Sequence, residues 1–367
     1  MIKAGRDGWS DKQIKDALHG VDGSQYVAFR YDILRQGIRR PVTLSAEGSV
    51  SLNRFNDIQR TARFALTGEV DWLRDEIKPY MLLRMDGDRF AEFPLGVFVL
   101  STPIRKSENG VTTWSVEAYD RTVILVEDSL VEPLYFAAEE PYLNAIQSVL
   151  VSAGITQVLI ADFVDTGLPT EREFEIGTRK LDVINTLLSE INFNPIYCDA
   201  DGRFIISKYK EPSILDVGYT YSADKMSIIG RDTESNMDYF NVPNVFIATC
   251  SNPELDQDYI SVYTNDNPAS KFSTVQRGRN IVSEIHQPDA IASQEDLDAY
   301  IRRIAFEANQ VYEPVKFSTA LNPLHERADV LSLNHPDARG VFVESGWSFP
   351  LEAGGEMAHE ARRLVIL

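Results

Sequence analysis

The acidic segment EREFEIG comes nearest to an enzymatic pattern, because Glu171, Glu173 and Glu175 alternate along it. If the segment is a strand, the three side chains share one face. Two carboxylates on either side of a glycosidic bond can act as acid and base in glycoside hydrolysis. A solvated acidic strand face has the same spacing, and we expect that arrangement here. A carbohydrate-active module, hydrolysing or binding glycans at these residues, is the alternative function.

The histidines do not form a recognisable metal motif. His325 precedes Glu326, and His359 precedes Glu360, which are the nearest approaches to ligand pairs. Neighbouring residues of a strand point to opposite faces, so neither pair predicts a metal site. The segments DADG and MDGD lack the further ligands of a calcium loop and fit hairpin turns. We therefore predict no metal.

Other sequence signatures of catalysis are also missing. The chain has no Gly-rich phosphate-binding loop, no Gly-x-Ser-x-Gly turn and no His-Glu-x-x-His helix. We therefore predict that the protein is not an enzyme and that it has no catalytic residue and no cofactor. Its two cysteines, Cys198 and Cys250, are too few for a disulfide framework and are expected to be buried thiols of a protein that folds in a reducing compartment.

Length and charge limit the remaining classes. A chain of 367 residues predicts two or three domains. Its net charge of −19 argues against general attraction to DNA or to an anionic membrane, which both require a positive surface. The sequence contains neither an apolar amino-terminal leader nor a run of the length that a membrane span needs.

Local patterns divide the chain into segments. Ser10 and Gln13 form a capping pattern, and Ile14 and Leu18 share a face, which predicts a helix within an amino-terminal segment 1–21. From 22 to 128 the sequence reads as short strands separated by turns such as Asp86-Gly87, which predicts a β-barrel.

A different pattern follows. Segment 129–208 contains two amphipathic helices, the first beginning at Pro141 and the second capped by Thr178, and then a hairpin that turns at Asp201-Gly202. Segment 239–312 is mixed α/β, contains a helix capped by Ser293 and Asp296, and is expected to pack with 129–208. Segments 209–238 and 313–367 return to strands and together predict a second β-barrel.

One motif occurs twice. Gly-Val-Phe-Val appears around Phe98 and again around Phe342, each time after a polar turn. The flanking segments also keep their order: RFAL, YMLLRM, GVFVLSTP and TTWSVEAYD correspond to KFSTAL, DVLSLNH, GVFVESGW and MAHEARRLVIL. We therefore expect an α+β, β-rich fold with two similar antiparallel β-barrel domains and mixed α/β domains inserted between them. Phe98 and Phe342 should be equivalent, inward-facing residues of the two barrel cores; chance similarity of two strands is the alternative.

Taken together, several segments resemble the tail proteins of long-tailed bacteriophages, and more narrowly their baseplate hub or tail-tip hub proteins. They include RTARFALTGEVDWLRDEIKPYMLLRM, FPLGVFVLSTP, NVFIATCSNPE and SGWSFPLEAGGEMAHEARRLV. The resemblance implies a homotrimeric ring in the virion, assembled in the host cytoplasm, that continues the tail tube to the tip. It also implies contacts with tail-tube or distal tail proteins, the tape-measure protein, and tip or fibre proteins. Many relatives continue into peptidase, lysozyme or fibre modules, which this sequence lacks after Leu367.

The resemblance gives the negative charge a possible use. A ring through which double-stranded DNA passes without binding needs repulsion from its wall, and at physiological salt a charge acts over only about 8 Å. The candidate lumen-facing acids lie in turns and connecting segments of the first barrel: Glu69, Asp71, Asp75, Asp86 and Asp88. Ordinary solvent exposure of the same carboxylates is the simpler explanation.

Overall fold

The chain was analysed as a computed structural model, which describes residues 1–21, 23, 25–40, 45–108, 110–224, 227–235, 242–250, 258–288, 291, 293–310 and 313–364. Asn109, expected in a hairpin turn, and the expected segment boundaries at 22, 238 and 312 lie outside these residues. Within the described residues no helix is long and apolar enough to cross a membrane.

The amino-terminal part has one helix followed by strands. The helix α1 (Asp11–Leu18) begins after Ser10, which forms the predicted capping box with Gln13, and it buries Ile14 and Leu18. Strand β5 shows why this region is a sheet, since buried and partly exposed residues alternate along it. The strands are β1 (Val27–Arg35), β2 (Ile38–Arg40), β3 (Ser45–Asn53), β4 (Arg60–Thr67), β5 (Asp75–Arg84), β6 (Phe90–Pro94), β7 (Phe98–Leu100), β8 (Ile104–Glu108) and β9 (Val111–Asp120).

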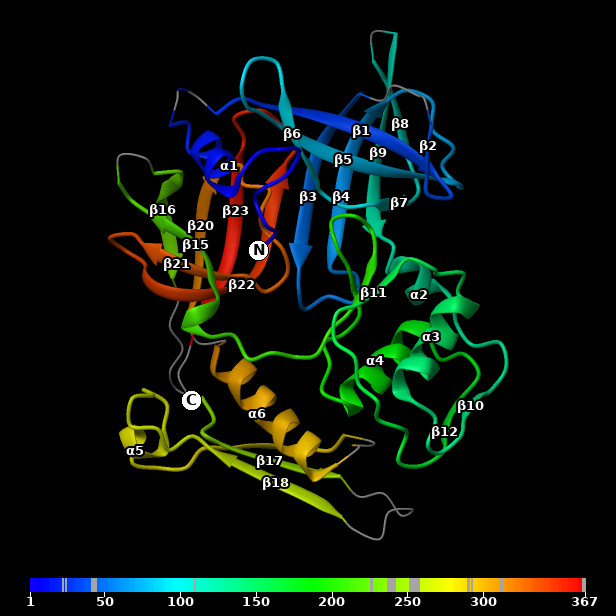
Figure 1. Ribbon diagram of the computed structural model, residues 1–367, viewed down its shortest axis with the longest axis vertical. Helices are drawn as coiled ribbons and strands as arrows, with labels where there is room; N and C mark the ends of the chain where they lie inside the picture. Colours follow the sequence, from blue (N-terminus) through cyan, green and yellow to red (C-terminus); the bar gives the residue numbers. More distant parts are fainter. Residues whose placement is uncertain are drawn as a thin grey trace.

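The second strand-rich part comes from two separate stretches of the chain. A short 3-10 helix, η1 (Ile214–Asp216), leads into the first stretch. The strands are β15 (Val217–Ser222), β16 (Ile229–Ser235), β20 (Pro314–Ala320), β21 (Val330–Asn334), β22 (Arg339–Pro350) and β23 (Glu356–Arg363). Figure 1 shows them beside the amino-terminal strands in the upper part of the molecule.

The expected pair of closed barrels is not what these strands form. They make one 15-stranded sheet, whose main path is β16-β20-β23-β22-β3-β4-β9-β7-β5-β1-β2. The reason is the length of β22: Arg339–Val343 pairs with β21, and the residues from Gly346 to Pro350 pair with β3 of the amino-terminal part. Because one strand serves both parts, the described strands join into an open sheet. The coarser expectation of a β-rich α+β fold with large antiparallel sheets is confirmed.

Within this sheet the two parts repeat one strand order. The sequence β4-β9-β7-β5 has its counterpart in β20-β23-β22-β21, and each neighbouring pair is antiparallel. The next neighbours differ, because β1 lies antiparallel to β5 whereas β15 lies parallel to β21. The strand segments that look alike in sequence therefore also occupy corresponding places in the sheet.

A smaller α/β part lies below the amino-terminal strands in Figure 1. Its two longest helices lie where the sequence predicts them, but the second begins after Arg179, whose side chain makes no cap hydrogen bond, rather than being capped by Thr178. The hairpin turns at Gly202, which has a positive φ of 79°. The elements are α2 (Val123–Glu127), β10 (Leu134–Phe136), α3 (Tyr142–Ser152), β11 (Val158–Ile160), β12 (Arg172–Phe174), α4 (Lys180–Glu190), β13 (Tyr197–Cys198) and β14 (Phe204–Ile206).

A third part lies at the bottom of Figure 1, where α6 covers a small sheet. Ser293 caps α6 through the predicted contact with Asp296, at 2.6 Å between the side-chain oxygens. The elements are β17 (Val245–Cys250), β18 (Tyr259–Thr264), α5 (Thr274–Arg277), β19 (Val282–His286) and α6 (Gln294–Gln310).

Each part has its own hydrophobic core. One cluster of buried residues lies under the large sheet, a second packs α3 and α4 against β14, and a third packs α6 on β17. Cys198 and Cys250 are both buried, as predicted, and neither forms a disulfide among the described residues. The division at 21, 128, 208, 238 and 312 stays a prediction.

Candidate functional site

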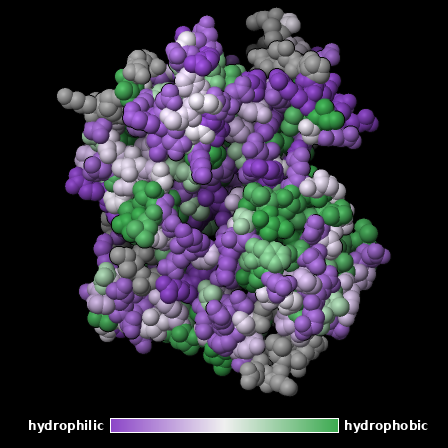
Figure 2. Space-filling view, viewed as in Figure 1, coloured by the Kyte–Doolittle hydropathy of each residue, from purple (hydrophilic) through white to green (hydrophobic). Residues whose placement is uncertain are grey.

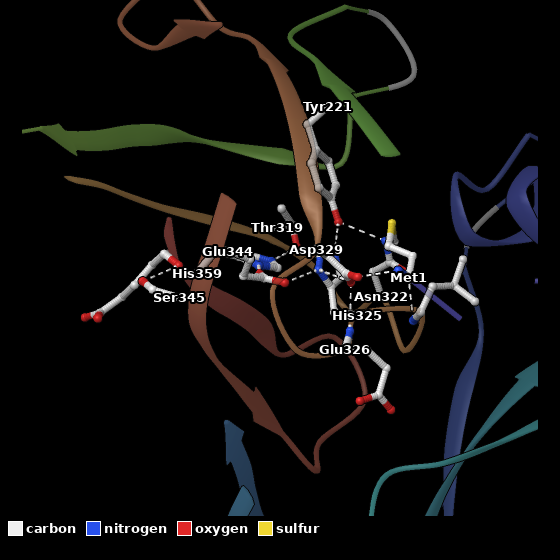
Figure 3. Close-up of polar contacts among 12 residues, drawn as sticks. Met1, Tyr221, Thr319, Asn322, His325, Glu326, Asp329, Glu344, Ser345 and His359 are labelled. Atoms are coloured by element: carbon white, nitrogen blue, oxygen red, sulfur yellow. Dashed lines mark hydrogen bonds and ion pairs between the residues drawn. The ribbon is translucent and has the colours of Figure 1, made fainter. Parts of the chain in front are cut away.

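The densest group of buried ionisable side chains lies in the second strand-rich part. His325 comes from the loop before β21, Glu344 from β22 and His359 from β23, and their polar atoms lie within 4.8 Å of one another. All three residues are buried, with 3%, 1% and 1% of their surface exposed. Figure 3 shows the side chains converging between the strands, with Tyr221 reaching His325 from β15.

Both oxygens of Glu344 contact an imidazole. Nδ1 of His325 lies 2.7 Å from Oε2, and Nδ1 of His359 lies 2.6 Å from Oε1. The outer ring nitrogens contact hydroxyl groups: Nε2 of His325 lies 2.6 Å from the Tyr221 hydroxyl, and Nε2 of His359 lies 2.9 Å from Oγ1 of Thr319. Every ring nitrogen of the two histidines therefore has a hydrogen-bond partner.

The hydrogen bonds favour one position for a proton of His325. The amide of Asn322 donates to the Tyr221 hydroxyl at 2.8 Å, which leaves the hydroxyl hydrogen available to Nε2 of His325. In that arrangement His325 carries its proton on Nδ1 and donates it to Glu344.

Burial acts on all three groups in the direction that removes charge. It lowers the pKa of His325 to about 4, and it also lowers the pKa of His359, against the opposing effect of Glu344. Burial likewise raises the pKa of Glu344. All three shifts favour the uncharged forms, and a protonated Glu344 would accept from His325 and donate to His359.

Asp329 lies at the edge of this cluster and makes a different set of contacts. Its carboxylate accepts from the backbone amide of Glu326 at 2.8 Å and pairs with the Met1 ammonium group. Burial raises the pKa of Asp329 to about 6, although the ammonium group opposes the rise. These contacts tie the first residue of the chain to the loop before β21.

The arrangement of His325, Glu344 and His359 does not fit a metal ion. Two bonds of 2.0–2.1 Å at a tetrahedral metal hold their donor atoms about 3.3 Å apart. The nitrogen–oxygen distances of 2.6 and 2.7 Å are instead those of strong hydrogen bonds. The cluster therefore acts as a buried hydrogen-bond network that links the loop before β21 with β15, β20, β22 and β23.

Sequence reasoning missed this network because it compared each histidine only with its neighbour. Glu326 pairs with Arg60, at 2.7 Å, and Glu360 pairs with Lys316, at 2.9 Å, so both neighbours lie outside the cluster. The repeat contained the missing signal. In its alignment Glu344 takes the place of Leu100, and His359 takes that of Val116, so polar residues occupy two positions that are apolar and buried in the first copy.

The two phenylalanines of the repeat lie in the interior and have matching neighbours. Phe98 is 0% exposed and Phe342 is 2% exposed. Phe98 stands between Ile77 and Asp120 of the adjoining strands, and Phe342 stands between Leu331 and Arg363.

The same register extends to an ion pair on the outer face. Arg63 of β4 pairs with Glu117 of β9 at 3.1 Å, and Lys316 of β20 pairs with Glu360 of β23 at 2.9 Å. Both pairs are directly opposed residues of adjacent strands. The two ion pairs therefore occupy corresponding places in the two halves of the sheet.

The five candidate lumen acids have different environments. Glu69 is exposed, and the side chain of Asp88 is fully exposed. Asp86 is exposed and pairs with Arg89 at 3.3 Å. Asp71 is partly exposed and pairs with Arg35 at 3.0 Å.

The environment of Asp75 differs from the one expected for a lumen-facing acid. Its side chain is 0% exposed and pairs with Arg35 at 2.9 Å and Arg40 at 2.5 Å. Burial alone would raise the pKa of Asp75, but hydrogen bonds from the Asp71 amide and from the two guanidinium groups outweigh it and lower the pKa. A carboxylate held inside in this way is a structural ion pair, so we remove Asp75 from the candidate channel residues.

The acidic strand has the solvated form that we expected. Glu171, Glu173 and Glu175 are exposed on β12 and beside it, and Glu171 accepts a hydrogen bond from Tyr135. Arg172 between them points the other way and pairs with the buried Glu190. None of the three acids lines any of four cavities found among the described residues.

Comparison with solved structures shows which known proteins share this fold. No family model and no curated protein sequence matches the chain. Among solved structures, the tail protein from Neisseria meningitidis MC58 superposes with a TM-score of 0.64 at 10% identity, over 92% of this chain and 97% of that one. The 43 kDa tail protein of prophage MuSo2 from Shewanella oneidensis gives a TM-score of 0.61 at 9% identity, over 90% and 97%.

A third structure, a prophage tail protein from Listeria monocytogenes, gives a TM-score of 0.51 at 10% identity, over 91% of this chain and 94% of that one. The chain thus has the fold of phage and prophage tail proteins, which confirms the resemblance seen in the sequence at the level of the fold. The similarity extends over nearly the whole of each chain, so it includes the α/β parts as well as the large sheet.

Proposed function

We propose that this protein is a structural component of a bacteriophage tail, located in the virion at the baseplate or tail tip, where it acts as the hub. Support comes from the shared fold with three tail proteins over at least nine tenths of the chain. The hydrogen-bond network agrees with a structural role, because its polar groups are buried and occupied with one another.

The observation that carries the proposal is the repeated strand order within one chain. Three copies arranged around a threefold axis would present six similar sheet units, so a trimer could match a neighbour with sixfold symmetry. We propose that the two units are the hub domains which the sequence predicts, although they are joined through β22 and β3 rather than closed separately.

In this role the homotrimer would contact tail-tube or distal tail proteins on one side and tip or fibre proteins on the other, with the tape-measure protein and then double-stranded DNA passing through the ring. Assembly would take place in the host cytoplasm. A net charge of −19 suits passage of DNA without binding.

The ring also needs contact surfaces between copies. Several large apolar side chains are almost fully exposed, namely Leu73 at 95%, Leu215 at 91%, Val131 at 90% and Phe163 at 80%. Figure 2 shows an apolar area on the face in view, at the place that β11 and α2 occupy in Figure 1. Apolar surface of this kind is suited to contacts with other chains.

Oligomeric state tests the proposal. We expect negative-stain images of tail ends to show a ring with threefold symmetry at the position of this chain, and native mass spectrometry of the isolated tip to count three copies. Two, four or six copies in that assembly would overturn the hub assignment.

A further inference from the structure

A cavity of about 440 Å³ lies where the three parts of the molecule meet. Its wall comes from the turn between β3 and β4, the loop before β21, the chain from Asn194 to Asp216, and the carboxyl-terminal half of α6. Figure 1 shows this meeting place, where the upper end of α6 approaches the lower edge of the sheet beside the stretch that leads to β15.

The wall is rich in positive charge, although acidic residues outnumber basic ones in the whole chain by 55 to 36. Of its charged residues, Lys210 pairs with Asp216 at 2.7 Å, and Arg303 pairs with Glu307 at 3.2 Å. The remaining cations are Arg54, Lys208 and Arg327, and none of them makes an ion pair among the described residues. The wall therefore carries an excess of cations over anions.

Aromatic rings hold the guanidinium groups in place. The guanidinium of Arg54 lies over Phe55 at 4.7 Å, that of Arg303 over Tyr209 at 4.5 Å, and that of Arg327 over Tyr197 at 5.1 Å. Arg362 lies over the same Phe55 ring at 4.2 Å. A guanidinium attracted to an aromatic ring still has several N–H groups, and those not used by the protein can donate to the oxygens of an anion.

Hydrogen-bond donors also exceed acceptors around the cavity. Nε of Arg327, Nε2 of Gln310 and the Tyr209 hydroxyl are buried and have no hydrogen-bond partner among the described residues. Gln310 already accepts from Arg54 with its oxygen, at 3.3 Å. Unused donors beside unpaired cations require a ligand that brings acceptor oxygens and negative charge.

The cations are close enough to weaken one another. Burial lowers the pKa of Arg54 to about 10; the Glu307 carboxylate opposes this shift, and the guanidinium groups of Arg327 and Arg362 add to it. Burial also lowers the pKa of Arg327, with Arg303 adding to the effect. An anion placed between these groups would relieve both the burial and the repulsion.

We propose that this cavity is an oxyanion-binding site in which Arg54, Arg303 and Arg327 bind a carboxylate or phosphate group through their N–H edges, with Lys208 at the rim. The oxyanion has two sources, a dissolved phosphate and the acidic side chain of a neighbouring protein segment, which share this chemistry. The site does not depend on the proposed role in a tail.

The test uses the full chain and two probes at constant ionic strength, inorganic phosphate and a blocked tetraglutamate peptide, with chloride as the reference. Binding is followed by titration calorimetry and by the shift in melting temperature. We expect at least one probe to bind and to raise the melting temperature. Phosphate binding would identify a small anion as the ligand, and binding of the peptide alone would identify an acidic protein segment.

Variants separate this site from general charge effects. Arg327→Gln and Arg54→Gln should each weaken binding of the active probe about tenfold, as the loss of one charge-assisted contact implies. Arg105→Gln, an exposed arginine on β8, should bind like the unaltered protein. Without a probe, Arg327→Gln should melt no lower than the unaltered chain, because it removes a repelling charge. Binding of neither probe, or equal binding by Arg327→Gln and Arg105→Gln, would overturn the proposal.

Discussion

At the residue scale, the feature that most constrains the interior is the central position of Glu344. A protonated carboxyl group offers one acceptor and one donor, and the cluster uses both: His325 donates to Oε2, and Oε1 lies beside Nδ1 of His359. A glutamine has the same shape and the same pair of functions. The choice between an ionised and a neutral Glu344 can therefore be tested by substitution.

We expect Glu344→Gln to change the free energy of unfolding by less than about 1 kcal/mol, since its amide reproduces both hydrogen bonds. Glu344→Leu should cost about 2–5 kcal/mol, because it leaves two buried imidazole nitrogens without partners. Urea denaturation at pH 7 measures both values. Equal losses in the two variants would mean that Glu344 is ionised and that an imidazolium balances it.

The histidines predict a dependence on pH. Since burial lowers the pKa of His325 from 6.5 to about 4, the unfolded chain takes up this proton first, and stability from His325 should fall as the pH drops from 6.5 to 4. Asp329 acts in the opposite sense: its pKa is raised from 3.8 to about 6, so its contribution is present below 3.8 and is lost as the pH rises through 6.

The ring resonances of His325, followed by NMR, should consequently show no titration until the pH approaches 4. His325 alone would give the unfolding free energy a slope of about 1.4 kcal/mol per pH unit between pH 4 and 6.5; His359 acts in the same sense, and Asp329 and Glu344 oppose both histidines. A midpoint for His325 near 6.5 would contradict the neutral, buried network.

At the element scale, the repeat predicts which side chains support each half of the sheet. Phe98 and Phe342 occupy corresponding places in β7 and β22, and both are buried. A buried Asp also lies at the start of the adjoining strand in both halves: Asp75 is the first residue of β5, and Asp329 comes directly before β21. In both halves a cation pairs with that carboxylate.

Phe98→Ala and Phe342→Ala should each lower the free energy of unfolding by about 3–5 kcal/mol, as expected when a core aromatic side chain is removed. Phe163→Ala is the matched control, because Phe163 is 80% exposed and its loss should cost less than about 0.5 kcal/mol. Chemical denaturation of the three variants gives the comparison. A cost below about 1 kcal/mol for only one of the two core phenylalanines would argue against their equivalence.

The helices could be located from sequence because their signals are local. The capping pairs of Ser10 with Gln13 and of Ser293 with Asp296 lie within one turn, and both form as predicted. The joining of the two strand-rich parts into one sheet could not be predicted in this way. It depends on Gly346 to Pro350 pairing with β3, almost 300 residues away in the chain, and no local pattern encodes that choice.

The cluster of His325, Glu344 and His359 also depends on strand pairing between segments that are separate in the chain. Each residue is unremarkable beside its sequence neighbours, and only the pairing of β22 with β21 and β23 brings them together. The repeat would have given a hint, because it aligns Glu344 and His359 with the buried Leu100 and Val116. A polar pair at two apolar positions of a repeat predicts a buried network.

At the scale of the whole molecule, some acidic residues form ion pairs inside the fold, and others are exposed and available for a function at the surface. Asp75 is buried between Arg35 and Arg40, so its charge is used inside the fold. Glu69 and Asp88 are exposed, and Asp86 pairs only with the exposed Arg89. Surface pairs contribute little to stability, so these three carboxylates can be changed without unfolding the chain.

If the exposed acids line a channel, reversing their charge should slow the DNA. We expect Glu69→Lys, Asp86→Lys and Asp88→Lys combined to leave assembly intact but to reduce the rate and extent of DNA ejection, because a basic wall binds phosphates with release of counterions. Particles with Gln or Asn at these three positions should eject DNA at a rate between those of the unaltered and the charge-reversed particles. Raised salt should lessen the defect, since it screens a field that reaches only about 8 Å even at physiological ionic strength. Asp75→Asn is the contrasting variant and should lower stability instead. Normal ejection by the charge-reversed particles would assign the acid excess to solubility.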